Sequence, residues 1–448
     1  MSAYLDVAEA GWRWVLAQVQ RDEHGLWLPE QVPHDGVPSP TRDGVHSGVG
    51  GLGHTLAELR VDRALTEEEQ DLADAVVERV RLDAATTTDA DYFDGLAGHL
   101  VVLTVLGSDA AEAVVSRLGE LLSPDGWPTQ HLGPPRADPD GRFNDATLGT
   151  ASVLLALVWA ARRSVSGAAA LALRTAEVLR AEAEPTPAGL TWAFVPRRYV
   201  LQPGPQMPNW SHGLAGIASA LALAGAELGH PDLVDAARRG VEHLVTLDDP
   251  DVAGFAVPRQ VPSPADQERH SWGWCHGPSG TSRVFAALEQ GGVDEVAGVA
   301  TQEWHRRCVE AVAASGLPER LRPGFWDNDG RCCGTAGVGE FLLDSFQRTG
   351  DERDLDLARS LGDVLVERAV LSGGAGAEDH AWWRFFEHTA EEPLLPPGTG
   401  WMQGAAGISA YLFRLARVCA DGPEAPRVPR LDTWWVVRAG EPGQVGPV

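Results

Sequence analysis

The chain has 448 residues, enough for two or three average domains or for a single large barrel or toroid. Its 63 acidic residues outnumber 36 basic ones, and the resulting formal net charge of -27 disfavours binding to nucleic-acid phosphates and anionic lipids. No apolar run approaches the roughly 20 residues that span a bilayer, and the N-terminus lacks a signal-peptide pattern. We therefore expect a cytoplasmic protein with no nucleic-acid partner and no transmembrane segment.

Amphipathic segments with a charged face recur along the chain. The first covers residues 4–19, and others begin at Thr66, Pro231 and Glu352. In each, apolar residues repeat with the 3.6-residue period of an α-helix, which is typical of a helix that packs one face and exposes the other. We interpret these segments as outer helices.

Between these segments a short phrase returns seven times: a polar residue, glycine, two further residues and a second glycine. In the third copy alanine stands at the first glycine position. The copies are HSGVGGLG at Gly48, FDGLAGHL at Gly95, NDATLGTA at Ala146, SHGLAGIA at Gly213, CHGPSGTS at Gly277, CCGTAGVG at Gly334 and MQGAAGIS at Gly404. Each copy opens a segment rich in Ala, Leu and Val, which predicts a helix buried on nearly all sides.

Seven inner helices alternating with seven outer ones predict an all-α fold, an α/α toroid of two concentric rings. We expect one domain over residues 1–420, followed by a tail at 421–448 that packs on or closes the toroid. Long Pro- and Gly-rich segments precede several inner helices, at 124–144, 184–209, 248–274 and 372–400. Because each runs into the start of an inner helix, these loops should gather at one end of the ring and form the active site there.

The position just before the first glycine of each copy is always polar. We call these the register residues: Ser47, Asp94, Asp145, His212, His276, Cys333 and Gln403. One position earlier, the fifth and sixth copies carry Cys275 and Cys332. Cys275 and Cys332 therefore stand at equivalent points of two neighbouring repeats, with Cys333 directly after Cys332. We call the end of the ring where these positions lie the mouth.

Five cysteines in so long a chain argue against a disulfide framework and favour thiolate chemistry or metal binding. Thiolates near helix N-termini are acidified, and zinc accepts three sulfurs while a catalytic zinc keeps its fourth position open. The sequence thus predicts one zinc ion held by Cys275, Cys332 and Cys333. The alternative is that these are buried cysteines, or that the adjacent pair forms a vicinal disulfide; Cys308 and Cys419 lie outside the register and are expected to be structural.

The motifs WSHGLAGI, WCHG and CCG, one in each of three successive repeats, resemble the HG, WCxG and CHG signatures of the LanC-like lanthionine synthetase family. The resemblance covers essentially the whole chain. It implies an α/α toroid with one zinc that adds a peptide cysteine thiol to dehydroalanine or dehydrobutyrine, forming a thioether ring. By position it makes Cys275 and Cys332 zinc ligands, with Cys333 in place of the usual histidine, as in the all-cysteine variant of these cyclases.

The same resemblance places the histidine of the HG motif on His212 and the family aspartate on Asp91, with Asp94 as its competitor. His276 stands where Tyr or Asn is usual. An enolate formed by thiol addition needs a proton donor, for which we expect His212 first and His276 second. Asp91 either orients such a histidine or binds substrate, or else only caps a helix.

A second departure from the family pattern lies just before Cys275. Ser271 stands where arginine is common, and Arg269 and His270 are candidates to replace it. The departure affects contacts to a carboxylate or phosphate group of a substrate and leaves the metal ligands unchanged.

The implied partners are a precursor peptide with dehydrated Ser or Thr and free Cys, and a separate dehydratase or kinase/lyase, because seven repeats occupy the chain. One alternative is a LanC-like zinc protein that binds glutathione or acts as a scaffold without peptide cyclisation. A more remote alternative is an α/α-toroid glycosidase, since the chain has 16 Trp residues. Such an enzyme needs paired carboxylates, whereas the register is mostly sulfur and imidazole in the middle repeats.

Overall fold

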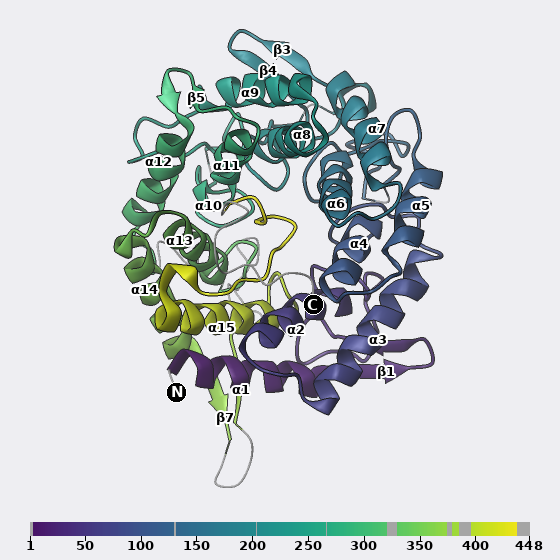
Figure 1. Cartoon of the computed structure of the whole chain (residues 1–448), viewed down its shortest axis with the longest axis vertical. Coiled ribbons are helices and arrows are strands. Elements are labelled where there is room, and N and C mark those ends of the chain that lie inside the picture. The colour runs from purple at the N-terminus through teal and green to yellow at the C-terminus, as the bar shows by residue number, and fades with distance from the viewer. Residues whose placement is uncertain are drawn as a thin grey trace.

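The computed structural model describes residues 3–129, 131–202, 204–265, 267–319, 329–373, 379–384 and 396–436. Within these ranges the chain forms fifteen α-helices and four antiparallel two-stranded hairpins. The helices are arranged as an inner and an outer ring around one axis (Figure 1). None of the described helices is long and apolar enough to cross a bilayer.

The inner ring contains one helix from each repeat. Its members are α2 (Leu52–Asp62), α4 (Leu96–Val105), α6 (Thr150–Arg162), α8 (Leu214–Leu228), α10 (Pro278–Thr281) with α11 (Arg283–Gln290), α13 (Thr335–Thr349) and α15 (Ala405–Asp421). Each packs on the next, and α15 contacts α2 and so closes the ring. The predicted all-α toroid is confirmed.

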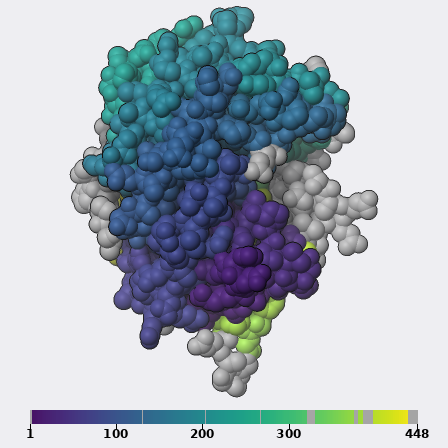
Figure 2. All heavy atoms as spheres, turned by 90° about the vertical axis from the view of Figure 1, so that its right-hand side faces the viewer, coloured from purple at the N-terminus to yellow at the C-terminus, as the bar shows by residue number. Residues whose placement is uncertain are grey.

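The outer ring covers the inner one. Its members are α1 (Ala3–Gln18), α3 (Glu67–Ala84), α5 (Ala111–Leu121), α7 (Ala168–Ala181), α9 (Pro231–Val245), α12 (Thr301–Ala314) and α14 (Glu352–Arg368). In α3, Thr66 and Glu69 form a capping box, and Leu72, Val76 and Val80 face the core. From the side, the colour runs from purple near the bottom to teal at the top, so the first part of the chain covers this face in chain order (Figure 2).

The fifth inner helix departs from the prediction of one continuous helix, because α10 ends at Thr281 and α11 begins at Arg283. The carbonyl of Ser279 accepts hydrogen bonds from the Ser282 hydroxyl at 3.1 Å and from Arg283 Nη1 at 2.8 Å. The Ser282 and Arg283 side chains thus compete with the backbone N–H groups that would bond to the Ser279 carbonyl in a continuous helix. This competition explains the break.

The second glycine of the repeated phrase lets the preceding loop fold back against the inner helix. A Cβ on Gly280 would lie 1.9 Å from the carbonyl oxygen of Trp274, and one on Gly337 equally close to that of Arg331. Only glycine permits such an approach. The repeated phrase therefore encodes the turn that leads each loop into the ring.

Short hairpins and 3₁₀ turns lie in the connections. They are β1 (Gln20–Asp22) with β2 (Gly25–Trp27), β3 (Glu184–Thr186) with β4 (Gly189–Thr191), β5 (Glu295–Val296) with β6 (Val299–Ala300), β7 (Val370–Ser372) with β8 (His380–Trp382), and η1 (Val49–Gly51), η2 (Arg197–Tyr199) and η3 (Gly422–Glu424). The loops predicted at 184–209 and 372–400 thus begin with hairpins. Residues 374–378 and 385–395 of the second loop lie outside the described part.

After α15 and η3, residues 425–436 run through the interior of the ring, where Figure 1 shows them in yellow. Arg430 is only 2% exposed and bonds Glu340 at 2.9 Å and also Glu58. Asp432 accepts a hydrogen bond from Trp274 Nε1 at 2.8 Å. Residues 425–436 therefore hold Trp274, the residue that precedes Cys275, in place. The domain boundary at residue 420 stays a prediction, and residues 437–448 lie outside the described part.

Candidate metal centre

Equivalent residues of neighbouring repeats are joined by backbone hydrogen bonds around the mouth of the ring. Ser211 donates its N–H to the carbonyl of Cys275 at 2.9 Å, and Cys275 donates to Cys332 at 3.1 Å. Cys332 donates to Met402 at 2.8 Å, and Met402 to His46 at 3.0 Å. We call this chain of bonds the backbone seam. It fixes the fifth and sixth repeats side by side and so holds their cysteines together.

The three cysteines form a compact group, which we call the sulfur cluster. The Sγ atoms of Cys275 and Cys333 lie 3.1 Å apart, those of Cys333 and Cys332 lie 3.5 Å apart, and all pairs are within 4.8 Å. All three are free, so the vicinal disulfide is not formed. Cys275 and Cys332 are buried and Cys333 is partly exposed. The cluster is therefore reached from the side of Cys333.

The three thiols differ in acidity. Hydrogen bonds from Cys332 and Cys333 hold the pKa of Cys275 well below its usual value. The hydrogen bond that each of the other two thiols makes with Cys275 raises the pKa of Cys332, and raises the pKa of Cys333 to about 12. One thiolate thus makes its two neighbours keep their protons. Loading a cation on three thiolates would release those protons.

The donor set fits zinc. Zinc–sulfur bonds of about 2.3 Å in a tetrahedron place the sulfurs about 3.8 Å apart. The two shortest Sγ–Sγ distances, 3.1 and 3.5 Å, would therefore widen by less than about 1 Å to hold the ion. Sulfur donors favour zinc over the hard cations. Among the described residues, no further His, Cys, Asp or Glu ligand atom joins this group. The described ligands would therefore leave a fourth position for water or a substrate thiol.

His212, on the turn before α8, is oriented by a buried carboxylate. Its Nδ1 lies 2.7 Å from Oδ2 of Asp145, which is fully buried, while 24% of the His212 side chain is exposed. Asp145 Oδ2 also accepts a hydrogen bond from the Thr147 hydroxyl at 2.8 Å. Because a carboxylate accepts the Nδ1 proton, the ring offers Nε2 for proton exchange.

His276 lies beside both His212 and the sulfur cluster. The ring centroids of His212 and His276 are 5.5 Å apart, and the chain continues directly from Cys275 to His276. Electrostatic interaction with His276 lowers the pKa of Cys333, against the larger effect of Cys275. The two imidazoles thus belong to the same site as the sulfurs.

The two candidates to replace the family arginine are both engaged elsewhere. Arg269 lies 3.0 Å and His270 3.1 Å from Oδ2 of Asp249. Ser271 itself is buried. The Arg269–Asp249 ion pair and the neighbouring His270 contact brace the loop before Cys275.

Asp91 has different neighbours from those considered in the sequence. It is 3% exposed; Oδ1 accepts the backbone N–H of Asp94 at 2.8 Å, and Oδ2 lies 3.4 Å from His131 Nε2. The hydrogen bond to Asp91 raises the pKa of His131 to about 8. Asp145, and not Asp91, is thus the carboxylate that orients His212.

Sequence reasoning missed the pairing of His212 with Asp145 and the contribution of Thr147. Asp145 is one of the register residues, so its polar side chain at that position indicated that it could belong to the site. Nothing in the sequence indicated that the third repeat reaches the histidine of the fourth.

The chain is similar to known proteins in both sequence and fold. Residues 39–420 match the family described as lanthionine synthetase C-like protein. The chain belongs to the lanthionine synthetase C-like family. Among curated proteins, none matches.

Solved structures related to this LanC-like chain show the same fold. Nisin cyclase superposes with a TM-score of 0.58 at 13% identity, over 84% of this chain and 89% of that one. The Lin0763 protein from Listeria innocua gives 0.52 at 10% identity, over 93% and 98%. A family 76 glycoside hydrolase from a bovine Bacteroides thetaiotaomicron strain gives 0.50 at 12% identity, over 93% and 78%. At such identities these likenesses establish the fold alone.

Proposed function

We propose that this chain is a zinc-dependent cyclase that adds cysteine thiols of a ribosomally made peptide to dehydroalanine or dehydrobutyrine, forming lanthionine or methyllanthionine. The observation that carries the proposal is the sulfur cluster beside the His212–Asp145 pair. Family membership supports it. The substrate would be a peptide whose Ser or Thr residues have already been dehydrated, the work of a separate dehydratase or kinase/lyase.

In this proposal Cys275, Cys332 and Cys333 hold one zinc ion. Bound zinc would keep a coordinated substrate thiol ionised near neutral pH. Three cysteinates carry more negative charge than two cysteinates and an imidazole. A substrate sulfur beside them would consequently be more nucleophilic and less strongly acidified.

His212 is the proposed proton donor. When the thiolate attacks the β-carbon, a C–S bond forms and the C=C electron pair moves into an enolate, so the α-carbon must take up a proton. The Asp145 bond to Nδ1 leaves His212 Nε2 to deliver that proton, and the proton lost by the next substrate thiol restores the imidazolium. His276, with its ring 5.5 Å away, is the second candidate.

For Asp91 the proposed role is a positioning one. Its bond to the backbone of Asp94 shapes the turn before α4, and its ion pair holds His131 beside the mouth. Of the three roles considered, a structural one is the role that its neighbours favour, although its bond to Asp94 belongs to the turn before α4 and the N-cap Gly95 receives no side-chain bond.

A second candidate function uses the same cluster without ring formation. Cysteine ligands that accept a peptide thiol would also accept glutathione, so a LanC-like zinc protein that binds glutathione or serves as a scaffold is the alternative. The two differ in one respect: only the cyclase consumes thiols of a dehydrated peptide.

Metal analysis combined with thiol counting tests the proposal. Ring formation leaves the peptide mass unchanged but removes one alkylatable thiol per ring, so alkylation followed by mass spectrometry counts rings. We expect one zinc per chain and loss of both zinc and cyclisation in Cys332→Ala, with Cys419→Ala as the matched control. Ring formation at the wild-type rate by zinc-free Cys332→Ala would refute the mechanism, and zinc binding without ring formation would favour the glutathione or scaffold function.

A further inference from the structure

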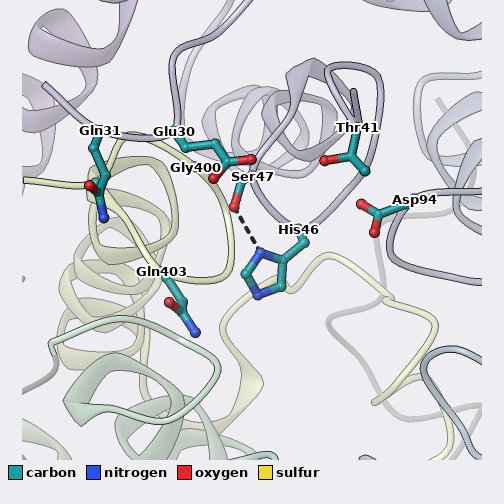
Figure 3. A pocket seen from close by; sticks show the side chains of 9 residues that line it. Glu30, Gln31, Thr41, His46, Ser47, Asp94, Gly400 and Gln403 are labelled. Atoms are coloured by element: carbon teal, nitrogen blue, oxygen red, sulfur yellow. Dashed lines mark hydrogen bonds between the residues drawn. The ribbon is translucent and has the colours of Figure 1, made fainter. Parts of the chain in front are cut away.

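A polar cavity of about 180 Å³ lies beside the turns that lead into α2, α4 and α15 (Figure 3). It is lined by Glu30, Gln31, Thr41, His46, Ser47, Asp94, Gly398, Gly400 and Gln403. None of these residues has a role in the proposed reaction. We call it the polar cavity.

The polar cavity adjoins the sulfur cluster. Gln403, Ser47 and Asp94 are the register residues of the seventh, first and second repeats, which follow Cys333 around the closed ring. The backbone seam links His46 through Met402 to Cys332, and His46 is close enough to Cys333 for an electrostatic interaction. The cavity therefore lies within reach of a residue next to a cysteine whose thiol is held at the cluster.

The wall of the polar cavity is built before any ligand arrives. Thr399 donates its N–H to the carbonyl of Glu30 at 3.2 Å, and Gln31 forms an antiparallel bridge with Gly398. Val32 donates to Pro397 at 3.0 Å. The segment after β2 is thus tied to the segment before α15, so the cavity does not need to be assembled by the substrate.

The lining carries two carboxyl groups, and a bound cation would favour the ionised form of both. Figure 3 shows the carboxyl groups of Glu30 and Asp94 facing the same space around Ser47 and His46. The lining residues include no arginine, and burial lowers the pKa of His46 to about 4, which keeps that ring neutral.

Asp94 lacks a cationic partner of its own within this lining. Burial, and then the neighbouring Asp91, raise its pKa to about 7. His131 acts in the opposite direction, but its ion pair is with Asp91. A cation placed in the cavity would relieve the crowding of carboxylates.

We propose that the polar cavity is a subsite for a lysine-sized ammonium group of the substrate peptide, on a residue adjacent to the reacting cysteine. The proposal rests on the proposed peptide-modifying function and names a feature of its substrate. An ammonium has three donors and no acceptor, which suits two carboxylates and the Ser47 and Thr41 hydroxyls. The formal net charge of -27 would also draw a cationic peptide towards the protein.

Binding of short probes tests the subsite without turnover. The probes are N-acetyl-Cys-Lys-amide and N-acetyl-Lys-Cys-amide, each beside a counterpart with norleucine in place of Lys, measured by calorimetry on the zinc-loaded full chain. We expect the Lys probe to bind about tenfold more tightly than its norleucine counterpart in at least one order. Equal affinities in both orders would overturn the proposal.

Two variants and one control locate the effect. Glu30→Gln and Asp94→Asn should each reduce the Lys preference to below about threefold, while Glu112→Gln, an equal charge change on the exposed face of α5, should preserve it. Glu30 is itself exposed, so its replacement should leave the fold intact. Loss of the Lys preference in Glu112→Gln would show that the preference reflects only the attraction of a cationic peptide to the negatively charged protein, and it would overturn the subsite.

The outcome separates the subsite from the reaction. A Lys preference that depends on Glu30 supports the subsite even if no dehydrated peptide is cyclised. Ring formation by a protein that shows no such preference contradicts the subsite and leaves the proposed function standing.

Discussion

Cys275 donates its backbone N–H to the carbonyl of Cys332 at 3.1 Å, although the two residues belong to different repeats. The bond sets the starts of two inner helices edge to edge. Because Cys333 follows Cys332 directly, its sulfur comes within 3.1 Å of that of Cys275. The sulfur cluster is thus a product of repeat stacking, and its arrangement depends on the backbone seam as well as on the three side chains.

Replacing Cys333 by histidine should keep the metal. A histidine stands at this position in the family motif that the chain resembles, and its imidazole is a zinc ligand of similar reach. We expect one zinc per chain in Cys333→His and a thiol count lowered by one. Loss of zinc from this variant, with zinc retained in Cys308→Ser, would mean that only sulfur fits this position.

The His212–Asp145 pair should control the rate and leave the metal untouched. His212→Asn removes the proposed proton donor, so kcat should fall by about 10²–10⁴-fold. Asp145→Asn keeps the size of the side chain but weakens its hold on Nδ1, and a loss of at least about 10–100-fold is expected, the range for hydrogen-bond partners of metal-ligating histidines. Single-turnover ring formation and zinc content measure the two effects. A parallel loss of zinc would show instead that the pair supports the fold of the site.

The His131–Asp91 pair should stabilise the protein only at lower pH. The hydrogen bond to Asp91 raises the pKa of His131 to about 8, above the ordinary value of about 6.5. The stabilisation is therefore complete below about pH 6.5 and disappears as the pH rises through 8. Since 34% of the His131 side chain is exposed, the effect should stay below about 1 kcal/mol.

Proton NMR of the His131 ring gives that pKa directly, and unfolding at pH 6 and pH 9 gives the stability. Asp91→Asn should return the titration towards the ordinary value and flatten the difference in unfolding free energy between the two pH values. An unchanged His131 titration in this variant would show that Asp91 is not the cause.

Arg430 should be a major stabilising residue. It bonds Glu340 and Glu58 in the interior, and both carboxylates are buried. Glu340 keeps Arg331 and Arg414, and Glu58 keeps Arg417, so neither carboxylate is left without a cation. Arg430→Met should therefore lower the free energy of unfolding by about 1.5–3 kcal/mol, the range for lost hydrogen bonds to charged groups. Urea denaturation measures this. Arg353→Met, which removes an exposed arginine from α14, should change stability by less than about 1 kcal/mol.

The alternation of inner and outer helices was predictable because buried helices are rich in apolar residues, whereas half-exposed helices also carry charged ones. The segment after Gly213 is rich in Ala and Leu and forms α8, which is buried along most of its length, while the charged face after Pro231 belongs to the outer helix α9. The break after Thr281 was not predictable, since it depends on which side chains take the Ser279 carbonyl.

The sequence by itself determined the seven-membered double ring and the convergence of Cys275, Cys332 and Cys333, because a repeated phrase places equivalent residues at equivalent points of a closed ring. Only the tertiary structure decided that Asp145 holds His212 and that Glu30 joins Asp94 around the polar cavity. The physical reason is that hydrogen bonds and charge pairs require atoms within about 3 Å, and a periodic pattern specifies which helix a residue starts but not which neighbouring side chain it reaches.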